Sequence, residues 1–287
     1  MNLAGPWPVR VVWLVLAFAL SPVVGAALDA HSTPVQVLVA TIAWVSWTGG
    51  VVAVLVPRTM GLTTIRIIAP AGLGLAMWAA VSADEMVLGA LGVVVAAVAT
   101  VVSLSPTTGD LFVNGSAYGA ERRFALRPPA AVLIGPVQLV WTLVVAGALT
   151  GPLLVATERW LAGGLATALG AVVVVFGCRS LHQLTRRWLV MVPAGIVIHD
   201  PAALTSQLFR RGTIASIGPA PADSGALDLT AGALGLALEV QLAETATLEL
   251  RTRGAKPRVV HADAVMFTPT RPGAVLREAT ERSLPVG

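Results

Sequence analysis

The sequence has little charge, a single lysine and a single cysteine. Charged residues make up 12% of the 287 residues, whereas hydrophobic residues make up 56%. A soluble chain of this length cannot cover its surface with so few charges, so the composition predicts a membrane protein. Arginine supplies every basic residue except Lys256, and the formal net charge is only +4. This small excess beside apolar runs favours membrane orientation over nucleic-acid binding.

The lone cysteine, Cys178, excludes an intramolecular disulfide framework and a multi-cysteine metal site. No H-x-x-x-H or H-E-x-x-H motif is present, and His182, His199 and His261 are unrelated in spacing. No glycine-rich stretch has the spacing of a loop that cradles a phosphate. We therefore expect no metal, no cofactor and no enzymatic activity.

Long apolar runs predict six membrane-crossing helices. A crossing of the ~30 Å hydrocarbon core takes about 20 residues. The runs cover residues 11–28, 35–56, 67–83, 86–104, 130–156 and 160–178. A secretory signal is the alternative for the first run, but signal cores span only ~7–15 residues. The predicted domains are a six-span region, residues 1–179, with a loop at 105–129, and a β-rich soluble region, residues 187–287.

The six runs contain no Asp, Glu, Lys, Arg or His. Ionisable groups at membrane depth usually mark transport or catalysis, so this composition disfavours ion-coupled transporters and intramembrane hydrolases. Small residues are frequent, as in Gly163-Gly164 and Ala166-x-x-x-Gly170, and they predict close helix packing. Pro70, Pro136 and Pro152, which lie inside the runs, are expected to kink their helices.

The arginines of the first two thirds of the chain lie almost entirely on one side of the six-span topology. On that side are Arg10, Arg58, Arg66, Arg122, Arg123, Arg127, Arg179, Arg186 and Arg187. The other side has Arg159, with Asp29, Asp84, Glu85 and Glu158. Cytoplasmic loops retain Lys and Arg, so the sequence predicts a plasma-membrane protein with both termini and the soluble region in the cytoplasm.

The loop at residues 105–129 has the most distinctive polar sequence of the first half. Asn114-Gly115 between short apolar runs is a turn signal and predicts a small hairpin against the membrane. The arginines of this loop and those after the last run are candidates for binding lipid head groups or a partner, together with the only tyrosine. The candidates are Tyr118, Arg122, Arg123, Arg127, Arg179, Arg186 and Arg187. The alternative is that these arginines only set orientation and pair with acidic neighbours.

After residue 187 the sequence changes to short strand-like pieces. Residues 188–193 and 196–200 predict two strands around a turn. Further strands are expected at 208–209, 213–217, 235–242, 246–252 and 258–261. Several of them alternate apolar and polar residues, which is typical of a sheet with one face on a core. Residues 272–282 predict a helix with proline near its first turn.

This order of short antiparallel strands closed by one C-terminal helix resembles the pleckstrin-homology-like (PH-like) domains of bacterial membrane proteins, over about residues 187–283. The whole chain is similar to uncharacterised actinobacterial integral membrane proteins through Tyr118–Phe124, Val192–Asp200 and Phe267–Gly273. The resemblance implies an α-helical membrane protein with a C-terminal PH-like domain that binds lipid head groups or a protein partner. It supplies no catalytic residues.

These observations favour a non-enzymatic integral membrane scaffold or assembly protein, whose cytoplasmic domain binds a protein partner or anionic lipid. An oligomeric channel is one alternative, because a Gly/Ala-rich last span followed by a β domain is similar in outline to small-conductance mechanosensitive channels. A small-molecule permease is another, which the uncharged runs disfavour. The sequence leaves homo-oligomerisation open, and nucleic acid is not an expected partner.

A tag fused after Gly287 tests the predicted orientation. We expect a membrane-impermeant reagent to reach the tag only after the membrane is permeabilised, because the arginine pattern assigns that end to the cytoplasm. Labelling of the tag on intact cells would contradict the orientation and the cytoplasmic location of the soluble region.

Overall fold

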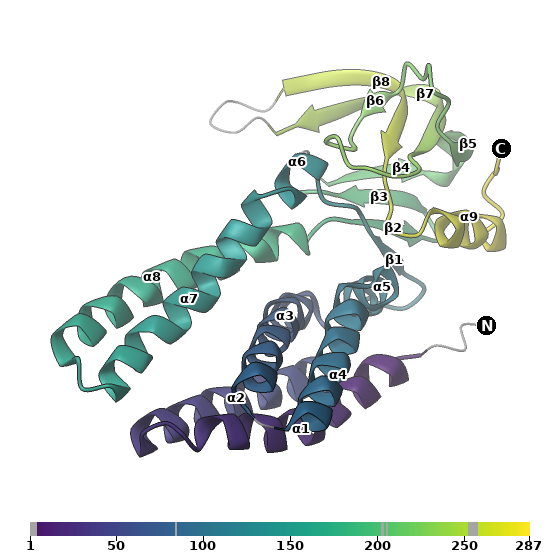
Figure 1. Cartoon of the computed structure of the whole chain (residues 1–287). Coiled ribbons are helices and arrows are strands. Elements are labelled where there is room, and N and C mark those ends of the chain that lie inside the picture. Colours follow the sequence, from purple (N-terminus) through teal and green to yellow (C-terminus); the bar gives the residue numbers. More distant parts are fainter. Residues whose placement is uncertain (1–4, 84, 202–203, 205, 252–257) are drawn as a thin grey trace. The chain divides into compact units, whose positions relative to one another are not determined.

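The structure is a computed structural model that describes residues 5–83, 85–201, 204, 206–251 and 258–287 (Figure 1). The chain divides into two compact units. The helical unit comprises residues 1–112 and 138–182, and the β unit comprises residues 113–137 and 183–287. Two residues of predicted elements, Asp84 and Thr252, lie outside the described residues.

Within the described residues, six helical spans are long and apolar enough to cross a membrane, as the sequence predicts. They are formed by α1 (Trp7–Leu28), α2 (Thr33–Leu55), α3 (Thr59–Ser82), α4 (Met86–Leu104), α6 (Ala130–Leu133) with α7 (Pro136–Ala156), and α8 (Trp160–Leu184). A short helix, α5 (Pro106–Asn114), follows α4. The fifth span is therefore interrupted between α6 and α7.

Two details of these helices differ from the sequence prediction. Helix α3 begins at Thr59 rather than at residue 67, so Arg66 lies inside it. A hydropathy pattern finds the apolar part of a helix, whereas the backbone hydrogen bonds continue into its polar end. Pro136 does not kink a helix, because it is the first residue of α7 and follows Gly135 at φ +107°. Proline suits a first turn, where its missing N–H has no intrahelical partner.

Hydrogen bonds bring several helix ends of the helical unit together. Arg10, in the first turn of α1, donates from Nε to the carbonyl oxygen of Val54 near the end of α2 (3.2 Å). Arg66 donates from Nε to the carbonyl oxygen of Ser103 near the end of α4 (3.4 Å). These arginines thus gather at one end of the unit, as the six-span alternation requires.

Indole groups also join helices inside the helical unit. Trp13 of α1 donates from Nε1 to the carbonyl oxygen of Trp47 in α2 (3.0 Å), and Trp47 donates from Nε1 to the carbonyl oxygen of Trp13 (2.9 Å). Trp141 of α7 donates in the same way to the carbonyl oxygen of Ile67 in α3 (3.1 Å). In an apolar solvent a buried N–H needs an internal acceptor, and these contacts supply one between neighbouring helices.

Helices α7 and α8 approach each other through glycine. A Cβ added to Gly170 would lie 2.2 Å from the carbonyl oxygen of Gly147, and one added to Gly151 would lie 2.3 Å from Oγ1 of Thr167. The small residues of the last span therefore pack against α7 of the same chain. Close backbone approach of this kind is the usual reason for small residues at membrane helix contacts.

The described part of the β unit contains two four-stranded sheets. The first has the order β1-β2-β3-β4 and consists of β1 (Arg122–Ala125), β2 (Trp188–Val192), β3 (Gly195–His199) and β4 (Gln207–Arg210). The second has the order β5-β7-β8-β6 and consists of β5 (Ile214–Pro219), β6 (Leu227–Asp228), β7 (Leu238–Leu250) and β8 (Arg258–Phe267). Buried residues of both sheets and of helix α9 (Pro272–Glu281) form one hydrophobic core.

The predicted strands around the turn at residues 193–195 are confirmed as β2 and β3, and the predicted C-terminal helix is confirmed as α9. Strand β7 (Leu238–Leu250) joins most of the two predicted strands 235–242 and 246–252 into one element, and its pairing with β8 is irregular between Gln241 and Ala246. Strand β6 pairs in parallel with β8, which departs from the antiparallel order expected from the sequence.

The predicted hairpin in the loop 105–129 is wrong. Asn114 is the last residue of α5, and β1 pairs with β2, Phe124 opposite Leu189. An isolated two-stranded hairpin is marginally stable, whereas a strand added to a larger sheet buries its apolar side chains. Phe124 and Leu126 are buried in the core of the β unit. The β unit is therefore built from two chain segments, and the chain passes between the units three times.

Gly170→Ala tests the close packing of α7 and α8. The added Cβ would lie 2.2 Å from a backbone oxygen of α7, and overpacking of this kind costs ~1–3 kcal/mol. We expect a lower free energy of unfolding in mixed detergent micelles. The matched control is Gly164→Ala on the same helix, where an added Cβ meets nothing within 4 Å. Equal effects of the two substitutions would contradict the contact.

Candidate functional site

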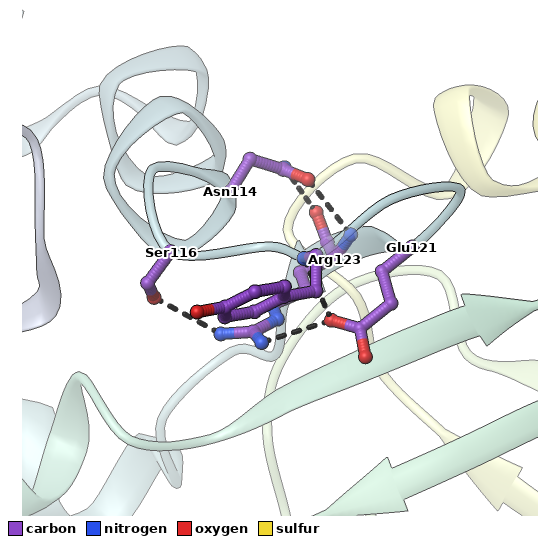
Figure 2. Close-up of polar contacts among 5 residues, drawn as sticks. Asn114, Ser116, Glu121 and Arg123 are labelled. Atoms are coloured by element: carbon purple, nitrogen blue, oxygen red, sulfur yellow. Dashed lines mark hydrogen bonds and ion pairs between the residues drawn. The ribbon is translucent and has the colours of Figure 1, made fainter.

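The loop that leads into β1 is closed by a two-point contact at Asn114. Its side-chain Oδ1 accepts a hydrogen bond from the backbone N–H of Arg123 (2.8 Å), and its Nδ2 donates to the carbonyl oxygen of the same residue. Figure 2 shows both contacts. The side-chain amide of Asn114 thus bonds both the N–H and the carbonyl of Arg123. A neighbouring strand would make the same two hydrogen bonds on this side of β1. Asn114 therefore fixes where β1 begins.

The guanidinium of Arg123 lies between two polar side chains of this loop (Figure 2). It donates from Nη1 to Oγ of Ser116 (3.0 Å) and from Nη2 to Oε2 of Glu121 (2.9 Å). The same carboxylate oxygen accepts the backbone N–H of Tyr118 (3.3 Å). The hydrogen bond from Arg123, followed by that from Tyr118, lowers the pKa of Glu121. The carboxylate is therefore ionised at neutral pH and orients Arg123.

Beyond these contacts, Arg123 faces an aromatic stack. Its Cζ lies 5.8 Å from the centre of the Trp188 ring, which is within cation–π range. Trp188 stacks on the imidazole of His199, with ring centres 4.6 Å apart and planes inclined by 21°. Trp188 and His199 are register partners on β2 and β3, so the sheet itself holds the two rings together. We call Arg123, Trp188 and His199 the Arg–Trp–His stack.

The pKa of His199 depends on its burial and on the charges around the stack. Nδ1 of the half-buried imidazole lies 2.7 Å from Oγ of Ser206. Burial lowers its pKa, and the nearby positive charges of Arg186 and Arg123 lower it further, although Asp200 opposes them. Burial is thus the main reason why the imidazole is predominantly neutral at pH 7, and charges of both signs act on it.

Arg187, another predicted head-group candidate, is buried in an ion pair. The side chain is 5% exposed, and its Nη2 lies 2.6 Å from Oδ2 of Asp200, which is itself 1% exposed. Its Nε donates to the same oxygen (2.8 Å) and its Nη1 donates to the carbonyl oxygen of Arg127 (3.0 Å). Removing one member of a buried pair typically costs ~3–5 kcal/mol, so this ion pair supports the fold rather than a ligand.

The other predicted residues are distributed unevenly around the stack. Arg122 places Cζ 6.0 Å from the ring centre of Phe124. The backbone N–H of Arg127 donates to the carbonyl oxygen of Thr268 (2.8 Å), so this arginine continues from β1 along the end of β8. Tyr118 is 83% exposed. Arg179 is exposed in α8 and belongs to the helical unit, so the β unit does not include it.

Sequence reasoning missed Trp188 and His199 as site residues, although a signal for them was present. In a hairpin with a fixed turn, residues at equal distance from the turn are opposite each other. The turn between β2 and β3 pairs Val192 with Gly195 and therefore Trp188 with His199. The sequence interpretation placed both residues on strands around a turn and did not follow the pairing back along those strands.

In the described part of the chain, no group of three His, Cys, Asp or Glu side chains comes together. Comparisons of the chain with protein-family models, with curated proteins and with solved structures found no match. The site is therefore interpreted from its own geometry.

The pH dependence of stability tests the environment of His199. Its pKa in the folded state lies below its ordinary value of 6.5, so the unfolded chain binds this proton more readily. Stability is fully present above pH 6.5 and falls as the pH drops toward the folded-state pKa. We expect His199→Gln to reduce the loss of thermal stability between pH 7 and pH 5. His261→Gln, on an exposed histidine of β8, is the control. An unchanged profile for His199→Gln would contradict the assignment.

Proposed function

We propose that this protein is a non-enzymatic integral membrane scaffold or assembly protein, whose β unit binds anionic lipid head groups at the Arg–Trp–His stack. The observation that carries the proposal is the conjunction of Arg123, Trp188 and His199 with the positive charge of Arg186. The β unit is taken as cytoplasmic and PH-like. Two four-stranded sheets with a helix after the last strand support that likeness by element order.

The chemistry of the stack suits a phosphate group. A guanidinium offers planar, paired N–H donors that match phosphate oxygens, and it stays charged at all physiological pH values. Trp188 has an apolar body and a polar N–H, a combination that favours the interface between lipid and water. The contact of Arg123 with Glu121 and Ser116 limits its rotamers before any ligand arrives, which lowers the entropic cost of binding.

The connections of the chain support a role at the membrane surface. Strand β2 starts at Trp188, four residues after α8 ends at Leu184. Four extended residues span at most ~14 Å, so Trp188 stays near the end of the last membrane helix. The chain also joins the two units at residues 112–113 and 137–138. These three connections attach the β unit to the helical unit. The attachment raises the effective concentration of head groups that the β unit meets, so even weakly binding residues hold a lipid.

Anionic-lipid retention by the full-length protein tests the proposal. We would compare phosphatidylglycerol with phosphatidylcholine bound to detergent-purified protein by native mass spectrometry. Each arginine near an anionic surface contributes ~1 kcal/mol, so the double variant Arg123→Gln/Arg186→Gln should lose ~2 kcal/mol of preference for phosphatidylglycerol, about 30-fold.

The matched control is Arg210→Gln/Arg258→Gln, which removes the same charge from exposed positions on β4 and β8. Both doubles should keep the circular dichroism spectrum of the parent protein. Equal loss of lipid in both would indicate a general charge effect, and unchanged retention in the first would refute the head-group site. The full-length chain is required, because a fragment that starts at residue 188 lacks β1 and Arg187.

A further inference from the structure

An apolar loop of the β unit is exposed between β6 and β7. Residues 229–237, which we call the β6–β7 loop, contain no charged side chain. Leu229 at one end and Leu238, the first residue of β7, belong to the core. Between them, Leu234 and Leu236 are 69% and 52% exposed. Loops that face water are usually polar, whereas exposed apolar residues that are grouped rather than scattered mark a contact with a membrane or a protein.

Hydrogen bonds within the chain shape the turn that precedes these two leucines. Oδ1 of Asp228 accepts the backbone N–H of Thr230 (2.7 Å), and Oγ1 of Thr230 accepts the N–H of Gly232 (3.2 Å). The carbonyl oxygen of Thr230 accepts the N–H of Ala233 (3.1 Å). Contacts of Asp and Thr side chains with the backbone two residues later are typical of turns. The loop therefore has a defined turn, and the exposure of both leucines belongs to the folded state.

The same turn contacts the start of the fifth span. The carbonyl oxygen of Gly232 accepts the backbone N–H of Ala130 (3.3 Å). Ala130 is the first residue of α6 and of the apolar stretch 130–156, which is long enough to cross a membrane. None of the described residues of α6 is buried, and Leu133 and Ile134 at its end are exposed. The β6–β7 loop thus lies beside apolar side chains that a membrane-crossing segment presents to lipid.

A positive charge lies beside the loop. Gly235 has φ +121°, and a Cβ added to it would lie 3.0 Å from Nε and 3.1 Å from Cζ of Arg127, so the guanidinium lies against this glycine. At a membrane interface, apolar side chains enter the hydrocarbon while the charged group of an arginine stays among the head groups. Arg127 and the two leucines therefore fit one boundary between lipid and water.

We propose that the β6–β7 loop inserts Leu234 and Leu236 into the apolar edge of the lipid bilayer beside the start of the fifth span. Acyl chains are the occupant of this surface, because the hydrogen bond between Gly232 and Ala130 places the turn where the apolar stretch begins. Transfer of exposed leucine from water to hydrocarbon is favourable in proportion to the area removed from water. The inference does not rest on the head-group proposal, because it concerns apolar side chains outside the Arg–Trp–His stack.

Depth measurements on the full-length protein in phosphatidylcholine nanodiscs test this insertion. Cys178→Ala removes the only cysteine, so Leu234→Cys or Leu236→Cys can be labelled singly with the fluorophore NBD. We expect blue-shifted emission that nitroxide on the upper acyl chain quenches at least about two-fold more than aqueous iodide does, because interfacial apolar side chains reach ~5–10 Å into the boundary between head groups and acyl chains. Phosphatidylcholine has no net charge, so this result is separate from the binding of anionic head groups.

The matched control is Val259→Cys in the same background, at a position on β8 that is 56% exposed. Val259 lies seven residues from Met266, whose carbonyl oxygen accepts the N–H of Leu229 at the start of the loop (2.9 Å). Seven strand residues span ~23 Å, so iodide should quench this probe more than the lipid nitroxide does.

Three outcomes would overturn the proposal. The first is stronger quenching by iodide than by lipid nitroxide at residues 234 and 236. The second is equal quenching by lipid nitroxide at residue 259. The third is blue-shifted emission that neither quencher reduces, because protein rather than lipid would then cover the loop.

Discussion

The β unit depends on the buried ion pair between Arg187 and Asp200. Arg187 directly precedes β2 and Asp200 directly follows β3, so the pair closes the open end of this hairpin. The same guanidinium reaches the carbonyl oxygen of Arg127, and the backbone carbonyl of Arg187 accepts the N–H of Leu126. One side chain thus joins the segment between the fourth and fifth spans to the segment after the sixth. Two buried charges are tolerated only because each satisfies the other.

The position of the candidate site follows from the register of that hairpin. Leu189 and Met191 of β2 and Ile196 and Ile198 of β3 face the core, so Trp188 and His199 face the opposite side of the sheet. Pairing of β1 with β2 then adds Arg123 to this side, because its neighbour Phe124 is buried. The stack and part of the core therefore lie on opposite faces of one sheet, and β1 contributes a residue to each.

Several polar side chains of the helical unit bond to backbone carbonyls of neighbouring helices, and its small residues pack within the same chain. Reciprocal indole hydrogen bonds join α1 to α2, and Gly147, Gly151 and Gly170 allow α7 and α8 to touch. The Gly/Ala pattern of the last span, which suggests a channel when read alone, has a structural explanation within a single chain. This packing leaves large apolar side chains such as Leu161, Leu165 and Leu169 of α8 exposed, as a lipid-facing helix requires.

The sequence by itself determined the six apolar helices, the β2–β3 hairpin and α9. Each of these depends on local periodicity or on hydropathy over a continuous stretch. Only the tertiary structure decided that β1 joins a sheet more than 60 residues later in the chain, that Arg187 is buried while Arg123 meets Trp188, and that the β6–β7 loop contacts the first residue of the fifth span. These features depend on which distant backbone supplies hydrogen bonds, and no local pattern in a single chain records that choice.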